Sequence, residues 1–257
     1  METLRVRDDG DVLRVVFDRP HRQNAINDVL LAELHAVLDR AEKSPECRIV
    51  TLSGDGGVFC TGMDFADATS TGAATDDLAE RGGRQFLGLL KRLTTVPRVV
   101  VSIVDGRVAG GGVGVAAASD FVYASGRSTF GLPEALWGLL PCCVLPFLVR
   151  RVGFQPASAM TMSTLPVPAE RAHQLQLVDE LADDAEPALR RLRMRLRRID
   201  PDTIADLKAY LRGMWALSDD MERAAVTEFS RLMSTGLVRD RIAGFASNQV
   251  LPWETRS

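Results

Sequence analysis

The sequence is poor in cysteine and histidine, and neither residue is spaced as a metal site or a disulfide framework requires. The four cysteines are Cys47, Cys60, Cys142 and Cys143. They form no paired C-x-x-C motifs, which would mark a zinc site, and no framework typical of secreted proteins. The three histidines are His21, His35 and His173. We therefore expect reduced thiols, no metal and no catalytic triad built on histidine.

A strong excess of one charge and a membrane-length apolar run are also missing. The 31 basic and 34 acidic residues give a net charge of −3, which implies no general attraction to nucleic acid or to an anionic membrane. The uncharged stretch Ala135–Val149 contains prolines and is shorter than the about 20 residues of a membrane span. The charged N-terminal residues resemble neither a secretory signal nor a transit peptide. We expect a cytoplasmic protein without nucleic-acid or membrane partners.

What the chain has is the composition of a globular protein, with 257 residues of which 46% are hydrophobic and 25% are charged. The spacing of the apolar residues predicts a strand over Val12–Phe17, a helix over Asp28–Lys43 and a buried strand over Val99–Val104. Further strands and helices alternate up to residue 124. This alternation favours a layered α/β core.

A change of pattern after Arg150 indicates a second, mainly helical part. Two amphipathic stretches predict helices over Ile204–Met214 and Met221–Met233. We place the boundary near residue 195, which divides the chain into a core of residues 1–195 and a helical region of residues 196–257. Residues 66–75 are dominated by Ala, Thr, Ser and Gly, and we interpret them as a mobile loop, either a lid or a connector.

The strongest local signal is the glycine run at residues 110–112, between a buried strand and a small-residue helix. Peptide N–H groups at a helix N-terminus have no partner within the helix, so they can stabilise negative charge on a thioester oxygen as an oxyanion hole. Tight helix packing is an alternative explanation. A dinucleotide site is another, because Gly112, Gly114 and Ala117 fit G-x-G-x-x-A, but no clear strand ending in an acidic ribose ligand follows.

Glu134 is the best candidate for acid-base chemistry. It ends the turn Gly131-Leu132-Pro133-Glu134, which is flanked by Phe130 and Trp137. Apolar surroundings disfavour a charged carboxylate and raise its pKa toward the range useful for proton transfer. The alternative is a glutamate that satisfies unpaired amides at the start of a helix.

Four motifs, in this order, resemble those of the crotonase (enoyl-CoA hydratase/isomerase) superfamily. They are Arg19-Pro20 with Asn24-Ala25-Ile26-Asn27, Phe59-Cys60-Thr61-Gly62-Met63-Asp64, Gly106 through Gly114, and Phe130-Gly131-Leu132-Pro133-Glu134 with Gly138. The resemblance implies an α/β crotonase fold, which is a spiral of ββα units with a helical C-terminal trimerisation region. It also implies that the backbone N–H groups of Met63 and Gly111 form the oxyanion hole.

One position departs from the pattern of that superfamily. A typical enoyl-CoA hydratase has two catalytic glutamates, and the resemblance places the first at Gly114 and the second at Glu134. With later segments added, the match is closest to the dehydratases of polyketide β-branching cassettes; these segments are residues 138–153, Met160-Thr161-Met162 and Pro252-Trp253-Glu254. That resemblance implies dehydration of 3-hydroxy-3-methylglutaryl-acyl carrier protein to 3-methylglutaconyl-acyl carrier protein. Glu134 would act as base and then as acid, and the phosphopantetheine or coenzyme A would belong to the substrate, so no further cofactor is implied.

Other functions within the same fold stay open. They are a CoA-dependent hydratase or isomerase, a decarboxylase of 3-methylglutaconyl-carrier protein and a noncatalytic trimeric scaffold. Asp64 is predicted to stabilise a turn, or to contact a lid or the substrate. The candidate cations for the carrier protein or the substrate are Arg84, Lys91, Arg92 and the basic segment of residues 190–198. We expect a homotrimer or a hexamer.

Overall fold

The computed structural model describes residues 1–65, 76–215, 217–248 and 251, so the expected loop over residues 66–75 lies outside the described residues. The described chain forms one sheet of six strands in the order β1-β2-β3-β5-β7-β10 and a second of four strands in the order β4-β6-β8-β9. The first contains β1 (Leu4–Asp8), β2 (Val12–Phe17), β3 (Ile49–Gly54), β5 (Val99–Val104), β7 (Phe121–Ala124) and β10 (Glu180–Leu181). The second contains β4 (Val58–Cys60), β6 (Arg107–Ala109), β8 (Thr129–Gly131) and β9 (Val167–Pro168).

The central strands of the first sheet are parallel, and their sequences are nearly continuous apolar runs. Strands β2, β3, β5 and β7 pair in parallel, and both faces of such a sheet are usually covered, which favours Val, Ile and Leu. The structure confirms the predicted strands over Val12–Phe17 and Val99–Val104. β1 pairs antiparallel at the edge, and its exposed side chains include Arg5 and Arg7, so it gave no continuous apolar run.

Three successive ββα units build the core, as the crotonase resemblance implied. In each unit a strand of the first sheet leads to a short strand of the second sheet and then to a helix. The helices that complete them are α3 (Asp76–Thr95), α4 (Gly111–Ala118) and α5 (Glu134–Trp137). Because β4, β6 and β8 are adjacent and parallel, the residues that follow them emerge at the same edge of the second sheet. Ligands bind at such carboxyl edges in many α/β proteins.

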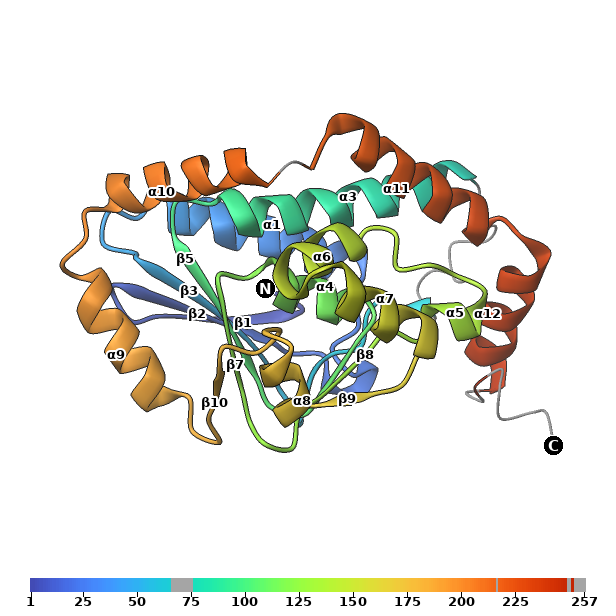
Figure 1. Cartoon of the computed structure of the whole chain (residues 1–257), viewed down its shortest axis with the longest axis horizontal. Helices are drawn as coiled ribbons and strands as arrows, with labels where there is room; N and C mark the ends of the chain where they lie inside the picture. The colour runs from blue at the N-terminus through green and yellow to red at the C-terminus, as the bar shows by residue number, and fades with distance from the viewer. Residues whose placement is uncertain (66–75, 216, 249–250, 252–257) are drawn as a thin grey trace.

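The remaining helices cover the sheets or extend the chain (Figure 1). α1 (Asp28–Lys43) has the predicted bounds, and the Leu30 N–H donates to Asn27 Oδ1 at its start (3.0 Å). The described chain also has a 3-10 turn near its N-terminus and seven helices after the core. These are η1 (Pro20–Arg22), α6 (Leu145–Val152), α7 (Phe154–Ser163), α8 (Ala169–Gln174), α9 (Glu186–Leu196), α10 (Pro201–Met214), α11 (Asp219–Met233) and α12 (Gly236–Asn248). Among the described residues, no helix combines the length and the apolar character that a membrane span needs.

The C-terminal helices pack on the core. α10 and α11 lie along α3 (Figure 1), and Val226 of α11 belongs to the main hydrophobic cluster. Lys208 of α10 is buried, and its Nζ lies 2.6 Å from Asp120 Oδ2 at the start of β7. The expected boundary near residue 195 falls inside α9 and stays a prediction.

Candidate active site

The carboxyl edge of the second sheet opens into a cavity of about 550 Å³. Met63 follows β4, Gly111 follows β6 and Glu134 follows β8, and all three line this cavity. The structure therefore brings together the three residues that the crotonase resemblance assigned to one site.

The Met63 N–H points away from Ile26, the residue with which Met63 pairs. Met63 forms a parallel bridge with Ile26, in which the Ile26 N–H donates to the Gly62 carbonyl (2.7 Å) and the Asp64 N–H donates to the Ile26 carbonyl (2.9 Å). In such a parallel bridge Met63, which lies between Gly62 and Asp64, turns its own N–H to the side opposite Ile26. Within the described residues the Met63 N–H donates to no backbone acceptor, so it is available to a ligand in the cavity.

Gly111 supplies the second N–H. It is the first residue of α4, so its amide has no acceptor within the helix. A β-carbon at Gly62 would lie only 2.9 Å from the Gly111 nitrogen, and Gly62 has a φ of +88°, so glycine is required for the two backbone segments to approach. This approach places the Met63 and Gly111 amides on one wall of the cavity. Together they can bind a carbonyl oxygen and stabilise the negative charge that develops on it.

Glu134 lies against the same glycine segment. A β-carbon at Gly110 would be 3.2 Å from Glu134 Oε1. The residue is partly accessible, but its Oε2 is shielded from solvent and has no hydrogen-bond partner among the described residues. Burial raises the pKa of Glu134 to about 7, and a hydrogen bond from its own N–H opposes this rise to a smaller extent. The carboxyl group can therefore accept and release a proton near neutral pH.

Position 114 cannot supply a second carboxylate without repacking. A β-carbon at Gly114 would lie 3.0 Å from Val144 Cγ2 and 3.2 Å from Leu90 Cδ1, with Phe86 Cζ at 3.4 Å. Apolar side chains thus occupy the space that the first catalytic glutamate of a typical hydratase would need.

Asp64 forms a buried ion pair with Arg19. Its Oδ2 lies 2.9 Å from Arg19 Nη2, and the same guanidinium donates to the Ala25 carbonyl (2.5 Å). Because the Asp64 N–H also donates to Ile26, these contacts tie the residues on both sides of the bridge to one guanidinium. This arrangement fixes the backbone next to Met63. Asp64 lines the cavity as well, and a contact with the substrate stays a prediction.

Three of the cations expected near the carrier protein or the substrate, Arg84, Lys91 and Arg92, form ion pairs outside the cavity. None of the three lines the cavity, and each forms an ion pair: Arg84 with Glu80, Lys91 with Glu222, and Arg92 with Asp39. Instead the cavity is lined by Arg81, which the sequence analysis did not single out. Which of Arg81 and Arg84 lines the cavity depends on how α3 packs, and no local sequence signal reports that.

The thiols and histidines contribute no evident nucleophile. Cys142 and Cys143 line the cavity, but burial raises their pKa values to about 11 and about 12, so they are protonated and weakly nucleophilic near pH 7. In the described part of the chain no histidine lines the cavity, and no three His, Cys, Asp or Glu side chains are placed to hold a metal ion. The expected absence of a cofactor stays a prediction.

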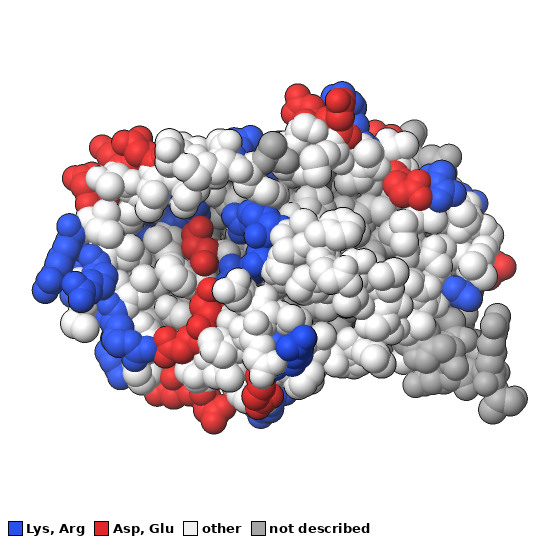
Figure 2. Space-filling model, viewed as in Figure 1, with Lys and Arg blue, Asp and Glu red and all other residues white. Residues whose placement is uncertain are grey.

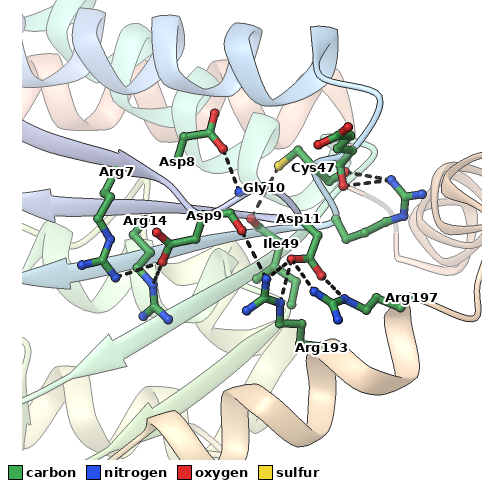
Figure 3. Close-up of polar contacts among 12 residues, drawn as sticks. Arg7, Asp8, Asp9, Gly10, Asp11, Arg14, Cys47, Ile49, Arg193 and Arg197 are labelled. Carbon is green, nitrogen blue, oxygen red and sulfur yellow. Dashed lines mark hydrogen bonds and ion pairs between the residues drawn. The ribbon is translucent and has the colours of Figure 1, made fainter.

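The basic segment on α9 lies away from this cavity. α9 and α5 are at opposite ends of the long axis (Figure 1), and Figure 2 shows Lys and Arg gathered over α9. Part of this charge is structural, because Arg193 and Arg197 converge on Asp11 between β1 and β2 (Figure 3), with Nε–oxygen distances of 2.7 and 2.6 Å. Arg191 pairs with Glu180. A contact of this segment with a carrier protein stays a prediction.

The C-terminal helices form one wall of the cavity, which the sequence analysis did not anticipate. Phe229 and Met233 of α11 line it. Trp137 of α5, three residues after Glu134, packs edge-on against Phe245 of α12, with ring centroids 5.4 Å apart. The helical region, which the resemblance implied joins subunits, therefore also contributes to the cavity that Glu134 lines.

Comparison with known proteins agrees with this geometry. Residues 7–254 match the model of the enoyl-CoA hydratase/isomerase family. The chain is 33% identical to the bacillaene synthase dehydratase PksH of Bacillus subtilis (strain 168), over 98% of this chain and 97% of that protein. It is 32% identical to the mevalonyl-coenzyme A hydratase SIDH of Beauveria bassiana, over 79% and 76% of the two chains.

The same relationship holds in three dimensions. The crystal structure of the polyketide-biosynthesis protein pksH from Bacillus subtilis superimposes with a TM-score of 0.88 at 32% identity, covering 97% of this chain and 99% of that chain. The fold, the ordered motifs and the family match thus lead to one conclusion: the chain belongs to the enoyl-CoA hydratase/isomerase (crotonase) family.

Proposed function

We propose that the protein is a dehydratase that converts a 3-hydroxy-3-methylglutaryl thioester of an acyl carrier protein into the 3-methylglutaconyl thioester. One observation carries this proposal: a single carboxyl group with a pKa near 7, Glu134, lies beside two backbone N–H donors in a mostly apolar cavity. The similarity to a dehydratase over 98% of the chain supports the direction of the reaction.

The geometry suits a stepwise elimination. The thioester oxygen binds the Met63 and Gly111 N–H groups, which makes the protons on the adjacent carbon more acidic. The Glu134 carboxylate removes one of these protons, and the electron pair forms an enolate held by the two amides. The enolate then expels the hydroxyl group from the next carbon. Glu134, now a carboxylic acid, gives its proton to that hydroxyl, so water leaves and the carboxylate is restored.

This scheme needs only one carboxylate. The same group carries the proton from the carbon to the departing oxygen, provided that both lie on one face of the substrate. The apolar filling around Gly114 is compatible with such a mechanism. It offers no carboxylate of its own to activate a separate water molecule.

Intact-protein mass spectrometry tests the proposal. Purified enzyme is incubated with 3-hydroxy-3-methylglutaryl-carrier protein, and the mass of the carrier is followed. The expected result is that the mass of the carrier falls by one water. This loss should be much slower with the Glu134→Gln variant. A further loss of carbon dioxide would identify a decarboxylase instead. Equal turnover of the coenzyme A thioester would favour a CoA-dependent hydratase, the function named for the relative from Beauveria bassiana.

A homotrimer or hexamer is part of the proposal. One face of α10 is apolar and exposed, with side chains at helical spacing that are 51–67% exposed: Leu207, Tyr210, Leu211 and Met214. We expect this face to contact a second copy of the chain. Light scattering should give the mass of a trimer or hexamer for the wild type and a smaller mass for Leu211→Asp. An unchanged mass would show that α10 is not the contact.

A further inference from the structure

Charge in the cavity wall is unbalanced. Three acidic residues line the cavity, Asp28, Asp64 and Glu134, and of these Asp64 is paired with Arg19 behind the wall, whereas Arg81 is the only basic residue among the described lining residues. The rest of the lining is mainly apolar. A substrate carboxylate that entered this space would lose water and face like charges, and both effects oppose binding unless a cation compensates them.

Arg81 is available for that purpose. It forms no ion pair with a described residue, whereas Arg84, one turn further along α3, is paired with Glu80. Arg81 is exposed to solvent while it contributes to the cavity wall. Neighbouring Gly82 has no side chain and open space around its α-carbon, so the backbone there does not obstruct the guanidinium.

The position of Arg81 along α3 fits a substrate held in the oxyanion hole. Phe86 of the same helix touches the donor segment, since its Cζ would lie 3.1 Å from a β-carbon at Gly111. Arg81 precedes Phe86 by five residues, which corresponds to about 7.5 Å along the helix axis. An extended 3-hydroxy-3-methylglutaryl chain spans about 5 Å from its thioester carbon to its carboxylate carbon. The long side chain of arginine covers the remaining distance.

Arg81 does not lower the pKa of Glu134. No charged neighbour contributes to the raised pKa of Glu134, whose causes are burial and its own amide. A cation close to that carboxyl group would have lowered the pKa. Arg81 is therefore placed to hold the far end of an acyl chain without weakening the base.

We infer that Arg81 binds the distal carboxylate of the acyl group and makes the enzyme selective for carboxylated thioesters. This inference rests on the proposed function. Because a guanidinium forms paired hydrogen bonds with a carboxylate, Arg81→Lys should retain only part of the selectivity.

The experiment compares two thioesters of pantetheine, which lacks the phosphate of phosphopantetheine. The acyl group is either 3-hydroxy-3-methylglutaryl, which carries a carboxylate, or its uncharged analogue 3-hydroxy-3-methylbutyryl. For Arg81→Ala, kcat/KM for the acid should fall by about 10- to 100-fold, as for the loss of a hydrogen bond between charged groups, while kcat/KM for the analogue should be unchanged. Arg84→Ala is the matched control from the same helix and should alter neither value.

The outcomes separate this inference from the proposed function. An equal fall for both substrates, or no fall for the acid, would overturn the role of Arg81 and leave the dehydratase proposal standing. If kcat/KM for both thioesters falls only in a parallel assay with phosphopantetheine in place of pantetheine, Arg81 binds that phosphate and the inference is wrong. Failure of the wild type to dehydrate 3-hydroxy-3-methylglutaryl-carrier protein would overturn the proposed function, and this inference with it.

Discussion

Glu134→Gln should stabilise the protein in alkaline solution while it strongly slows dehydration. The substitution preserves the shape of the side chain and removes its titration. In the folded protein burial raises the pKa of Glu134 from its ordinary value of 4.5 to about 7. The folded state therefore binds this proton more tightly than the unfolded chain does. The wild type is favoured by this group below pH 4.5 and loses that contribution as the pH rises through about 7.

The magnitude follows from the two pKa values. The difference between 4.5 and about 7 corresponds to at most about 3 kcal/mol in the free energy of unfolding. At pH 5 the side chain is protonated and nearly equivalent to Gln, so the two proteins should have similar stability. At pH 9 the wild type carries a buried charge that the variant lacks, and the variant should be more stable. Its dehydration rate should fall by about 10²–10⁴.

Urea unfolding at pH 5, 7 and 9 measures this effect. Glu33→Gln is the control of opposite sign. Burial acts to raise the pKa of Glu33, but hydrogen bonds from Thr3 and from the Glu2 N–H together lower it. That variant should be less stable than the wild type at pH 7, and the difference should vanish as the pH falls through the lowered pKa. If Glu134→Gln were less stable than the wild type at pH 9, the carboxyl group would not be buried as the structure shows.

Three further substitutions test the supporting geometry. Gly62→Ala should reduce kcat by about 10²–10³, measured by steady-state kinetics, because the new methyl group meets the Gly111 nitrogen. Gly114→Glu should give no new activity and should cost about 1–3 kcal/mol, measured by urea unfolding, because Val144 and Leu90 fill the space. Asp64→Asn should lower the free energy of unfolding by about 3 kcal/mol, measured in the same way, because it removes the buried charge that faces Arg19.

Each of these has an outcome that contradicts it. Full activity of Gly62→Ala would mean that the two amides do not act together. A Gly114→Glu protein as stable as the wild type would show that the apolar filling is loose. For Asp64, the control is Asp8→Asn, which removes an exposed partner of Arg40 and should change stability by less than about 1 kcal/mol. If Asp64→Asn and Asp8→Asn changed the free energy of unfolding equally, the buried pair would not stabilise the protein more than an exposed pair does.

Long elements with a continuous pattern could be predicted from the sequence. The bounds of β2, α1 and β5 followed from apolar spacing together with local capping and proline signals. β4 was predicted as a short strand after the glycines that follow β3, but β6 and β8 could not be derived from periodicity, because three residues are too few to show a period. The pairing of β4, β6 and β8 joins residues about 20 to 50 positions apart in the chain, and only the resemblance to a known family supplied it.

The site, too, could be predicted only in part. Ordered motifs pointed to Met63, Gly111 and Glu134, but Arg81 and the α11 wall could not be found in the sequence. Arg81 and Arg84 look alike in the sequence, one turn apart on one helix. Only the packing of α3 turns one toward the cavity and lets the other pair with Glu80.

The backbone origin of the oxyanion hole explains why its motifs consist of glycines rather than of the donors themselves. Any residue except proline would supply an N–H at position 63, so the donor places little demand on its own side chain. The residues that must lack a side chain are instead the neighbours of the donors. A β-carbon at Gly112 would lie 2.3 Å from the Cys60 carbonyl oxygen, and one at Gly62 would meet the Gly111 nitrogen. The two donor segments can approach only where these side chains are missing, so the glycine pattern records the contact between β4 and α4 that creates the site.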